Sequence, residues 1–172
     1  MADPSRAAGT GPAGLVVRPL TPADAAEVAT WQYDGPWRIY DSRPEDGPLG
    51  PDSGVQAVAD SATGELVGYI CLGAEARVPG LAAEPGVIDV GAGMRPDLVG
   101  SRIGSDFGAA VLGHIAGQVG QSRLRAVVLS WNERSLRLCA RLGFRAIGTH
   151  TCLQDGRENT YVVLVTDGPA AG

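Results

Sequence analysis

The spacing of apolar residues along the chain predicts a succession of strands. Residues 15–20 (LVVRPL) have strand character, and residues 55–60 and 65–76, joined by an Ala-Thr-Gly turn, have the alternating pattern of an antiparallel hairpin. Residues 87–94 predict a further strand, which must end before Pro96 because proline has no N–H for the ladder. One buried strand and two late strands complete the set at residues 124–130, 144–150 and 158–165.

Helices are predicted between these strands. Thr21 is a suitable N-cap before Pro22, and the helix that begins there is expected to extend to about residue 31. Apolar residues at every fourth position predict a second helix over residues 103–119. Asn132 is expected to cap a third helix that runs to about residue 142 and stops at Gly143.

Three glycines interrupt the second predicted helix. Gly108, Gly113 and Gly117 each cost about 1 kcal/mol relative to alanine inside a helix. We expect close packing against a sheet to offset this cost.

The order of elements predicts an α+β fold with helices layered on a mixed, mostly antiparallel central sheet. About seven strands and about four helices are expected in a single domain over residues 15–166. Residues 1–14 and 167–172 are rich in Ala, Gly and Pro, and we expect them to be disordered tails.

Composition narrows the function. The net charge is −5 and there is no basic run, which argues against nucleic acid as a partner and leans toward cationic substrates. No apolar stretch is long enough to span a membrane or to serve as a signal peptide, and the three cysteines are an odd number, so a reduced, cytoplasmic protein is expected. The two histidines have no ligand-like spacing, so no metal is expected.

A glycine-containing loop lies between the fourth predicted strand and the helix at residue 103. Glycines in residues 95–105 (RPDLVGSRIGS) allow several backbone N–H groups to converge at a helix N-terminus, where the helix dipole favours a pyrophosphate. The alternative is an ordinary turn. A dinucleotide-binding fingerprint and a P-loop are both absent from the sequence.

This loop and the segment at residues 131–144 (WNERSLRLCARLGF) together resemble the GNAT superfamily of N-acetyltransferases. The family's anion loop, Q/R-x-x-G-x-G/A, aligns with residues 99–104. Val99 stands at its polar first position and Arg102 at its central glycine. The resemblance spans residues 15–165 in the order of elements.

The second family pattern, N-x-x-A-x-x-L-Y-x-x-x-G-F, lies in the segment after the fifth predicted strand. Ser135 takes the place of its alanine, and Cys139 stands where the tyrosine is expected. The other positions are matched by Asn132, Leu138, Gly143 and Phe144.

The resemblance implies an enzyme that transfers the acetyl group of acetyl-CoA to a primary amine by direct attack in a ternary complex. The strand at residues 87–94 would splay from the one at 124–130, with the pantetheine arm in the gap. The amine, of a small molecule or a protein N-terminus, would enter from the other side. The alternative is a non-catalytic acyl-CoA-binding or regulatory protein. A homodimer is common in the family, but no residue identifies an interface.

The cofactor-binding residues implied by the resemblance lie in the two motifs and at the end of the fourth strand. The backbone N–H near Met94 or Arg95 would stabilise charge on the thioester oxygen. Arg102 is expected either to pair with a phosphate or to block the approach to it, and we favour pairing. The full set is Met94, Arg95, Val99, Gly100, Ser101, Arg102, Ile103, Gly104, Ser105, Asn132 and Ser135.

Three residues are candidates for proton transfer. Asp89 shares a strand face with Gly91 and Gly93 and could accept the proton of the amine, or it could be an ordinary polar residue bound to a loop. Cys139 could protonate the leaving thiolate, although a small buried hydrophobe is the favoured interpretation. Tyr161 is a second candidate acid, and water a third.

An aromatic cluster lies between the first two predicted helices, where a short helix is expected to begin at Pro36. In the GNAT superfamily this region often shapes the acceptor pocket. Core packing of the short helix is the alternative. The cluster consists of Trp31, Tyr33, Trp37 and Tyr40.

Overall fold

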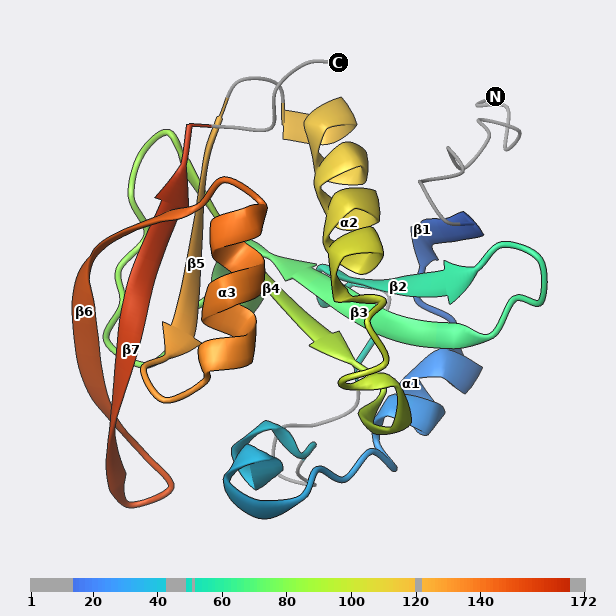
Figure 1. Ribbon diagram of the computed structural model, residues 1–172, viewed down its shortest axis with the longest axis horizontal. Helices are drawn as coiled ribbons and strands as arrows, with labels where there is room; N and C mark the ends of the chain where they lie inside the picture. Colours follow the sequence, from blue (N-terminus) through green and yellow to red (C-terminus); the bar gives the residue numbers. More distant parts are fainter. Residues whose placement is uncertain (1–13, 43–48, 51, 120–121, 168–172) are drawn as a thin grey trace.

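The computed structural model describes residues 14–42, 49–50, 52–119 and 122–167. Within them the chain forms one seven-stranded sheet in the order β1-β2-β3-β4-β5-β7-β6, in which only β4 and β5 are parallel neighbours (Figure 1). This confirms the predicted fold class. The strands are β1 (Leu15–Pro19), β2 (Val55–Asp60), β3 (Leu66–Leu72), β4 (Val87–Met94), β5 (Arg123–Leu129), β6 (Arg145–Gln154) and β7 (Arg157–Thr166).

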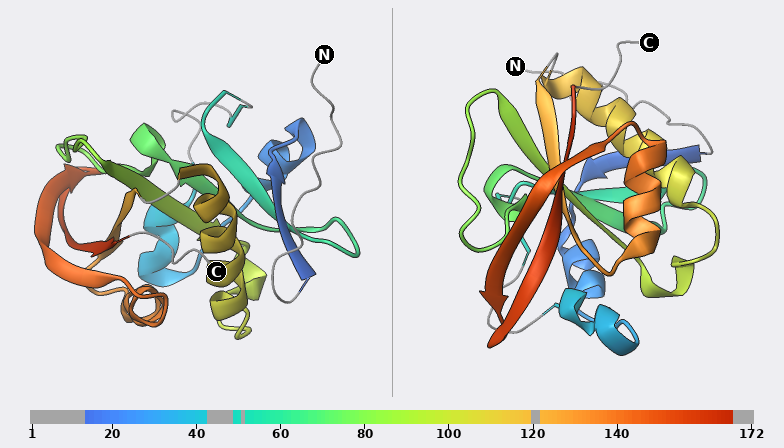
Figure 2. Two further views of the ribbon diagram at one scale, coloured as in Figure 1. Left: turned by 90° about the horizontal axis from the view of Figure 1, so that it is seen from above. Right: turned by 60° about the vertical axis from the view of Figure 1, so that its left-hand side comes forward.

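Helices cover both faces of the sheet. Helices α2 and α3 lie side by side on one face, and α1 lies on the other (Figures 1 and 2). The predicted tails, residues 1–14 and 167–172, lie outside the described residues apart from Gly14 and Asp167. The helices are α1 (Pro22–Val28), α2 (Gly104–Val119) and α3 (Glu133–Arg141), with 3-10 helices η2 (Gly35–Tyr40), η4 (Gly73–Ala76) and η5 (Pro96–Leu98).

Helix α1 begins as predicted and ends earlier. The Thr21 hydroxyl accepts from the Asp24 N–H at 3.1 Å, and the Asp24 carboxylate accepts from the Thr21 N–H at 2.8 Å, which is a capping box. The Trp31 N–H bonds to the Val28 carbonyl three residues back, so the final turn tightens and releases Trp31 from the helix.

Strand β3 also ends earlier than predicted, at Leu72 instead of residue 76. Gly73 has a φ of 74°, a left-handed conformation that breaks the extended chain and turns it into η4. Strand β4 has the predicted bounds.

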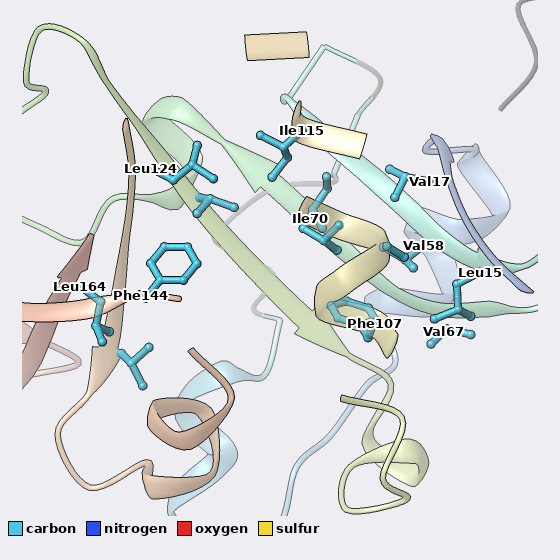
Figure 3. Packing of buried hydrophobic residues seen from close by; sticks show 14 residues of the cluster. Leu15, Val17, Val58, Val67, Ile70, Phe107, Ile115, Leu124, Phe144 and Leu164 are labelled. Carbon is cyan, nitrogen blue, oxygen red and sulfur yellow. The ribbon is translucent and has the colours of Figure 1, made fainter. Parts of the chain in front are cut away.

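The larger core lies between the sheet and helices α2 and α3. Phe107, Val111 and Ile115 from α2 pack against Val58 and Ile70 of the sheet (Figure 3). An ideal Cβ at Gly68 would lie 2.6 Å from the Phe107 ring and 2.4 Å from the Gly93 carbonyl oxygen. The absence of a side chain at residue 68 therefore lets the first turns of α2 approach the sheet closely.

Strands β4 and β5 pair over a short distance only. Their register covers Val87 with Arg123, Ile88 with Leu124 and Asp89 with Arg125, after which the two strands diverge. The predicted splay is thus present, and it opens toward the C-terminal ends of both strands (Figure 1).

The glycines of α2 do not share one cause. An ideal Cβ at Gly108 would lie 2.5 Å from Leu142 Cδ1, so this glycine allows close contact with the end of α3. No atom lies within 4 Å of the corresponding positions at Gly113 and Gly117. The expectation that packing against a sheet offsets all three is therefore wrong.

We predict that Gly113→Ala and Gly117→Ala each stabilise the protein by about 1 kcal/mol, because alanine is the better helix former and its methyl group meets open space. Gly108→Ala is expected to destabilise it, since Leu142 must move. Urea unfolding followed by circular dichroism measures all three variants. A similar gain at the three positions would contradict the proposed contact between Gly108 and Leu142.

Candidate active site

A cavity of about 620 Å³ opens where β4 and β5 diverge. Residues of both strands line it, together with residues of η2, α2, α3 and the loop between β4 and α2. None of the described lining residues is Asp, Glu or His. The described lining of the cavity therefore holds no carboxylate or imidazole.

The backbone N–H and carbonyl groups of successive β4 residues point alternately toward β3 and toward this cavity. The Arg95 N–H donates to the Val67 carbonyl at 2.9 Å, so residues of odd number on β4 bond to β3. Ala92 and Met94 consequently direct their N–H and carbonyl groups toward the opening. The Met94 carbonyl accepts from the Tyr33 hydroxyl at 2.7 Å, which agrees with this orientation. Of the two N–H groups considered for the thioester oxygen, only that of Met94 faces the cavity.

The loop between β4 and α2 ends in free helix N–H groups. The first backbone hydrogen bond of α2 runs from the Phe107 N–H to the Ile103 carbonyl at 2.8 Å. The N–H groups of Gly104, Ser105 and Asp106 precede this bond and have no partner within the helix. A phosphate at this position would receive several hydrogen bonds and the favourable end of the helix dipole.

Arg102 has an unusual backbone conformation. Its φ is 71°, and Gly100, two residues earlier, has a φ of 86°. A left-handed conformation costs a non-glycine residue roughly 1–2 kcal/mol, which explains why the family pattern has glycine at this position. The exposed side chain of Arg102 lines the cavity, so the residue contributes a cation to the loop.

Most of the cofactor-binding residues expected from the sequence line the cavity. Asn132 is 4% exposed; its side-chain oxygen accepts from the Ser135 N–H at 3.2 Å, which confirms that it caps α3. Its Nδ2 donates to the Tyr40 hydroxyl at 3.1 Å. The expected residues found in the lining are Met94, Val99, Gly100, Arg102, Gly104, Ser105, Asn132 and Ser135.

Three expected cofactor-binding residues lie outside the cavity lining. The Arg95 guanidinium pairs with Asp97 at 2.7 Å. The Ser101 hydroxyl donates to the Leu98 carbonyl at 2.5 Å. Ile103 packs against the core. These side chains contact the protein itself instead of the cavity, and their assignment as cofactor contacts stays a prediction.

The assignment of Asp89 as the base is corrected. Its carboxylate is 3% exposed, binds Arg125 Nε at 2.6 Å and Nη2 at 3.1 Å, and binds Arg77 Nη1 at 3.1 Å. Arg125 also donates to the Ala82 carbonyl at 2.7 Å, which ties the loop before β4 to the sheet. Both carboxylate oxygens are occupied and the residue does not line the cavity. The alternative, a polar residue bound to a loop, describes it better.

The two candidate acids lie in different surroundings. Cys139 lines the cavity, and burial raises the pKa of its thiol to about 11. An ordinary leaving thiol has a pKa of about 8.5, so proton transfer from Cys139 would be unfavourable. Tyr161 lies outside the lining, its hydroxyl donates to Gln154 Oε1 at 2.5 Å, and burial raises its pKa to about 12. The structure favours a packing role for both side chains.

The aromatic cluster divides into two parts. Tyr33, Trp37 and Tyr40 line the cavity. Trp31 does not: it is 7% exposed and stacks on Tyr69, with ring centroids 6.0 Å apart, in the core on the α1 side of the sheet. The prediction that Trp31 contacts the substrate is therefore corrected, and core packing accounts for it.

Sequence reasoning missed Tyr69 as a wall of the cavity. An ideal Cβ at Gly93 would lie 2.4 Å from Tyr69 Cζ, so the space left by this glycine is filled by Tyr69 and not by a substrate. No local pattern marks Tyr69, because its place depends on the pairing of β3 with β4.

Three arginines of α3 were also missed. Arg134, Arg137 and Arg141 follow one another at helical spacing and all line the cavity, as does Arg102. The intervals of three and four residues would have shown that they share a helix face. The cavity is therefore basic although the whole chain is acidic. The expectation of a cationic substrate, which came from the net charge, is not supported by the residues of this cavity.

Comparison with known proteins identifies relatives of the chain. The family model described as Acetyltransferase (GNAT) domain matches residues 14–145. No curated protein sequence matches. Among the described residues, no helix is long and apolar enough to cross a membrane, and no group of three or more His, Cys, Asp or Glu residues is arranged to hold a metal ion.

Solved structures of acetyltransferases have the same fold. A GNAT-family acetyltransferase from Bacillus anthracis has a TM-score of 0.66 at 17% identity, covering 88% of this chain and 93% of its own. A spermidine N-acetyltransferase SpeG chimera from Vibrio cholerae and hSSAT has a TM-score of 0.66 at 13% identity, with 89% and 95% covered. AAC(6')-Ib in complex with ribostamycin and coenzyme A has a TM-score of 0.65 at 18% identity, with 90% and 93% covered.

We predict that Asp89→Asn lowers the free energy of unfolding by about 3 kcal/mol, because it leaves the buried Arg125 without its anion. Turnover by the folded protein is expected to remain within a few-fold of the original. Asp97→Asn, which alters an exposed ion pair with Arg95, is the matched control and should leave stability unchanged. Normal stability of Asp89→Asn combined with loss of turnover would restore Asp89 as the base.

Proposed function

Since the chain belongs to the GNAT acetyltransferase family and is an acetyl-CoA-dependent N-acetyltransferase, we propose that it acetylates a primary amine by direct attack in a ternary complex. One observation carries this proposal: the cavity at the β4–β5 divergence joins unpaired backbone groups of the sheet to the N-terminus of α2. A single elongated ligand with amide groups and phosphates matches both parts.

The walls of the opening suit the amide groups of a pantetheine arm. The Ser130 N–H donates to the Thr160 carbonyl on β7, so Val127, at odd spacing from it, directs its backbone groups away from β7 and toward β4. Val127 on one side and Ala92 and Met94 on the other present donors and acceptors to the gap. Without a ligand or water to bond to, these buried groups would have no hydrogen-bond partner.

Acetyl-CoA supplies the acetyl thioester when it is bound. The Met94 N–H is the donor that we assign to the thioester oxygen, because it faces the cavity whereas the Arg95 N–H is bound to Val67. Tyr33 holds the Met94 carbonyl at 2.7 Å and so fixes the orientation of this part of β4. The free N–H groups at the start of α2, with Arg102, bind the phosphates.

The proton of the amine has no carboxylate or imidazole to go to in this cavity. The tyrosine hydroxyls of the lining are neutral at pH 7, as an ordinary tyrosine is. Burial raises the pKa of Tyr33, that of Tyr40, and that of Tyr69 to about 12, so none of them is prepared to act as a base. We therefore assign proton removal to water, with the amine reacting from its neutral fraction.

The lining also favours a class of acceptor. The Tyr33 hydroxyl binds the Met94 carbonyl and the Tyr69 ring lies against Gly93, so aromatic side chains line the cavity beside the end of β4. If the acceptor carried a second positive charge, that charge would be buried there without an anionic partner, and its desolvation would be unfavourable. An amine on an apolar or aromatic body fits this wall better than a polycation.

The second candidate function is a non-catalytic acyl-CoA-binding protein of the same fold. Two departures from the family pattern favour it: Arg102 in place of glycine and Cys139, with its raised pKa, in place of tyrosine. Release of free thiol in the presence of amines separates the candidates, because only the enzyme produces CoA.

We predict micromolar binding of acetyl-CoA and of CoA by calorimetric titration, weakened about tenfold in Arg102→Ala through loss of a charge-assisted hydrogen bond. Arg102→Gly is the matched variant: it removes the same cation and also relieves the left-handed backbone, so it should bind equally weakly but unfold at a higher temperature. A folded wild-type protein that binds neither ligand would exclude the acetyltransferase assignment.

We predict that kcat/KM for the amine rises with pH and levels off above the pKa of the amine itself, because the neutral amine is the nucleophile. Two acceptors whose pKa values differ by about two units should give profiles displaced by the same interval. A fixed inflection below pH 8 with both acceptors would reveal a base on the enzyme and contradict the assignment to water.

A further inference from the structure

Arg134 in the first turn of α3 reaches toward the anion loop. Its Nη2 lies 3.9 Å from the position of an ideal Cβ on Gly100, which has no side chain of its own. Arg134 lines the main cavity and also an adjoining cavity of about 270 Å³, whose walls include Val99. The guanidinium thus lies where the loop and α3 come together.

An aromatic platform holds this guanidinium. Its Cζ is 5.7 Å from the centroid of the Trp37 ring, within range of a cation–π contact. Trp37 is supported in turn by Trp131, with ring centroids 5.1 Å apart in an edge-to-face arrangement. A cation–π contact does not use the N–H donors of a guanidinium as hydrogen-bond partners, so these donors stay available to a ligand.

The anion loop lacks a polar side chain at its first position. Val99 occupies the position at which the family pattern has Gln or Arg. Among the described residues, Arg134 has no ion-pair partner within 4.0 Å, although Asp34 lines the smaller cavity with it. Arg134, which has no ion-pair partner among the described residues, therefore lies beside a loop that has the apolar Val99 at the position of the family's Gln or Arg.

We propose that Arg134 binds the pyrophosphate of acetyl-CoA and replaces the polar side chain that is missing at Val99. This assignment rests on the proposed function and extends it to a residue outside the loop. A guanidinium can contact two phosphate oxygens at once, which an ammonium cannot do in the same plane. Arg137 and Arg141 lie further along α3, and of the described side chains only that of Arg134 comes within 4 Å of the ideal Cβ position of Gly100.

The test is calorimetric titration of Arg134→Ala and Arg134→Lys with acetyl-CoA and with dephospho-CoA, which keeps the pyrophosphate and lacks the 3′-phosphate. We expect Arg134→Ala to weaken both ligands about tenfold and Arg134→Lys to recover part of the loss. Arg145→Ala is the control, because it removes one exposed arginine that does not line the cavity. It should leave both affinities unchanged.

The outcomes distinguish this assignment from the proposed function. Normal binding by the wild type and by Arg134→Ala would overturn the role of Arg134 alone. A loss with acetyl-CoA but not with dephospho-CoA would place Arg134 at the 3′-phosphate and would overturn the pyrophosphate assignment. Failure of the folded wild-type protein to bind either ligand would overturn the proposed function and this inference with it.

Discussion

The divergence of β4 and β5 is the feature on which the rest of the site depends. Three residue pairs join the two strands, and the last of them, Asp89 with Arg125, is also a buried ion pair at 2.6 Å. Parallel strands normally remain paired because an unpaired buried N–H or carbonyl is costly. Beyond this pair, backbone N–H and carbonyl groups of β4 and β5 that no longer bond to each other line a cavity. The ion pair therefore stabilises the point at which β4 and β5 begin to diverge.

Rigid walls require close packing on both faces of the opening. Gly68 admits the Phe107 ring on the α2 side, and Gly93 admits the Tyr69 ring on the α1 side. Each ring fills the space that the side chain of a residue larger than glycine would occupy at that position. The end of β4 is thus fixed between two aromatic side chains, and Tyr33 binds its last carbonyl. The N–H of Met94 gains its orientation from this packing and from no side chain of its own.

Local patterns were sufficient for the elements but not for the roles of individual residues. Strand β4, the N-caps Thr21 and Asn132 and the left-handed glycine after α3 follow from short-range rules, and the structure contains all of them. The partners of Asp89 come from other segments, so its face on the strand could not reveal that it was already bound. Trp31 was grouped with Tyr33 by proximity in sequence, yet Trp31 packs in the core against Tyr69 whereas Tyr33 lines the cavity.

Charge illustrates why a global property misleads about a site. The chain carries a net charge of −5, but the cavity is lined by Arg102, Arg134, Arg137 and Arg141 and, among the described residues, by no acid. A field of this kind attracts a polyanionic ligand into a molecule that repels anions at long range. Screening confines the long-range repulsion to low salt, whereas the exposed arginines of the lining act at contact distance. The exposed arginines of the lining, with the free N–H groups at the start of α2, thus favour an anionic ligand in a chain of net negative charge.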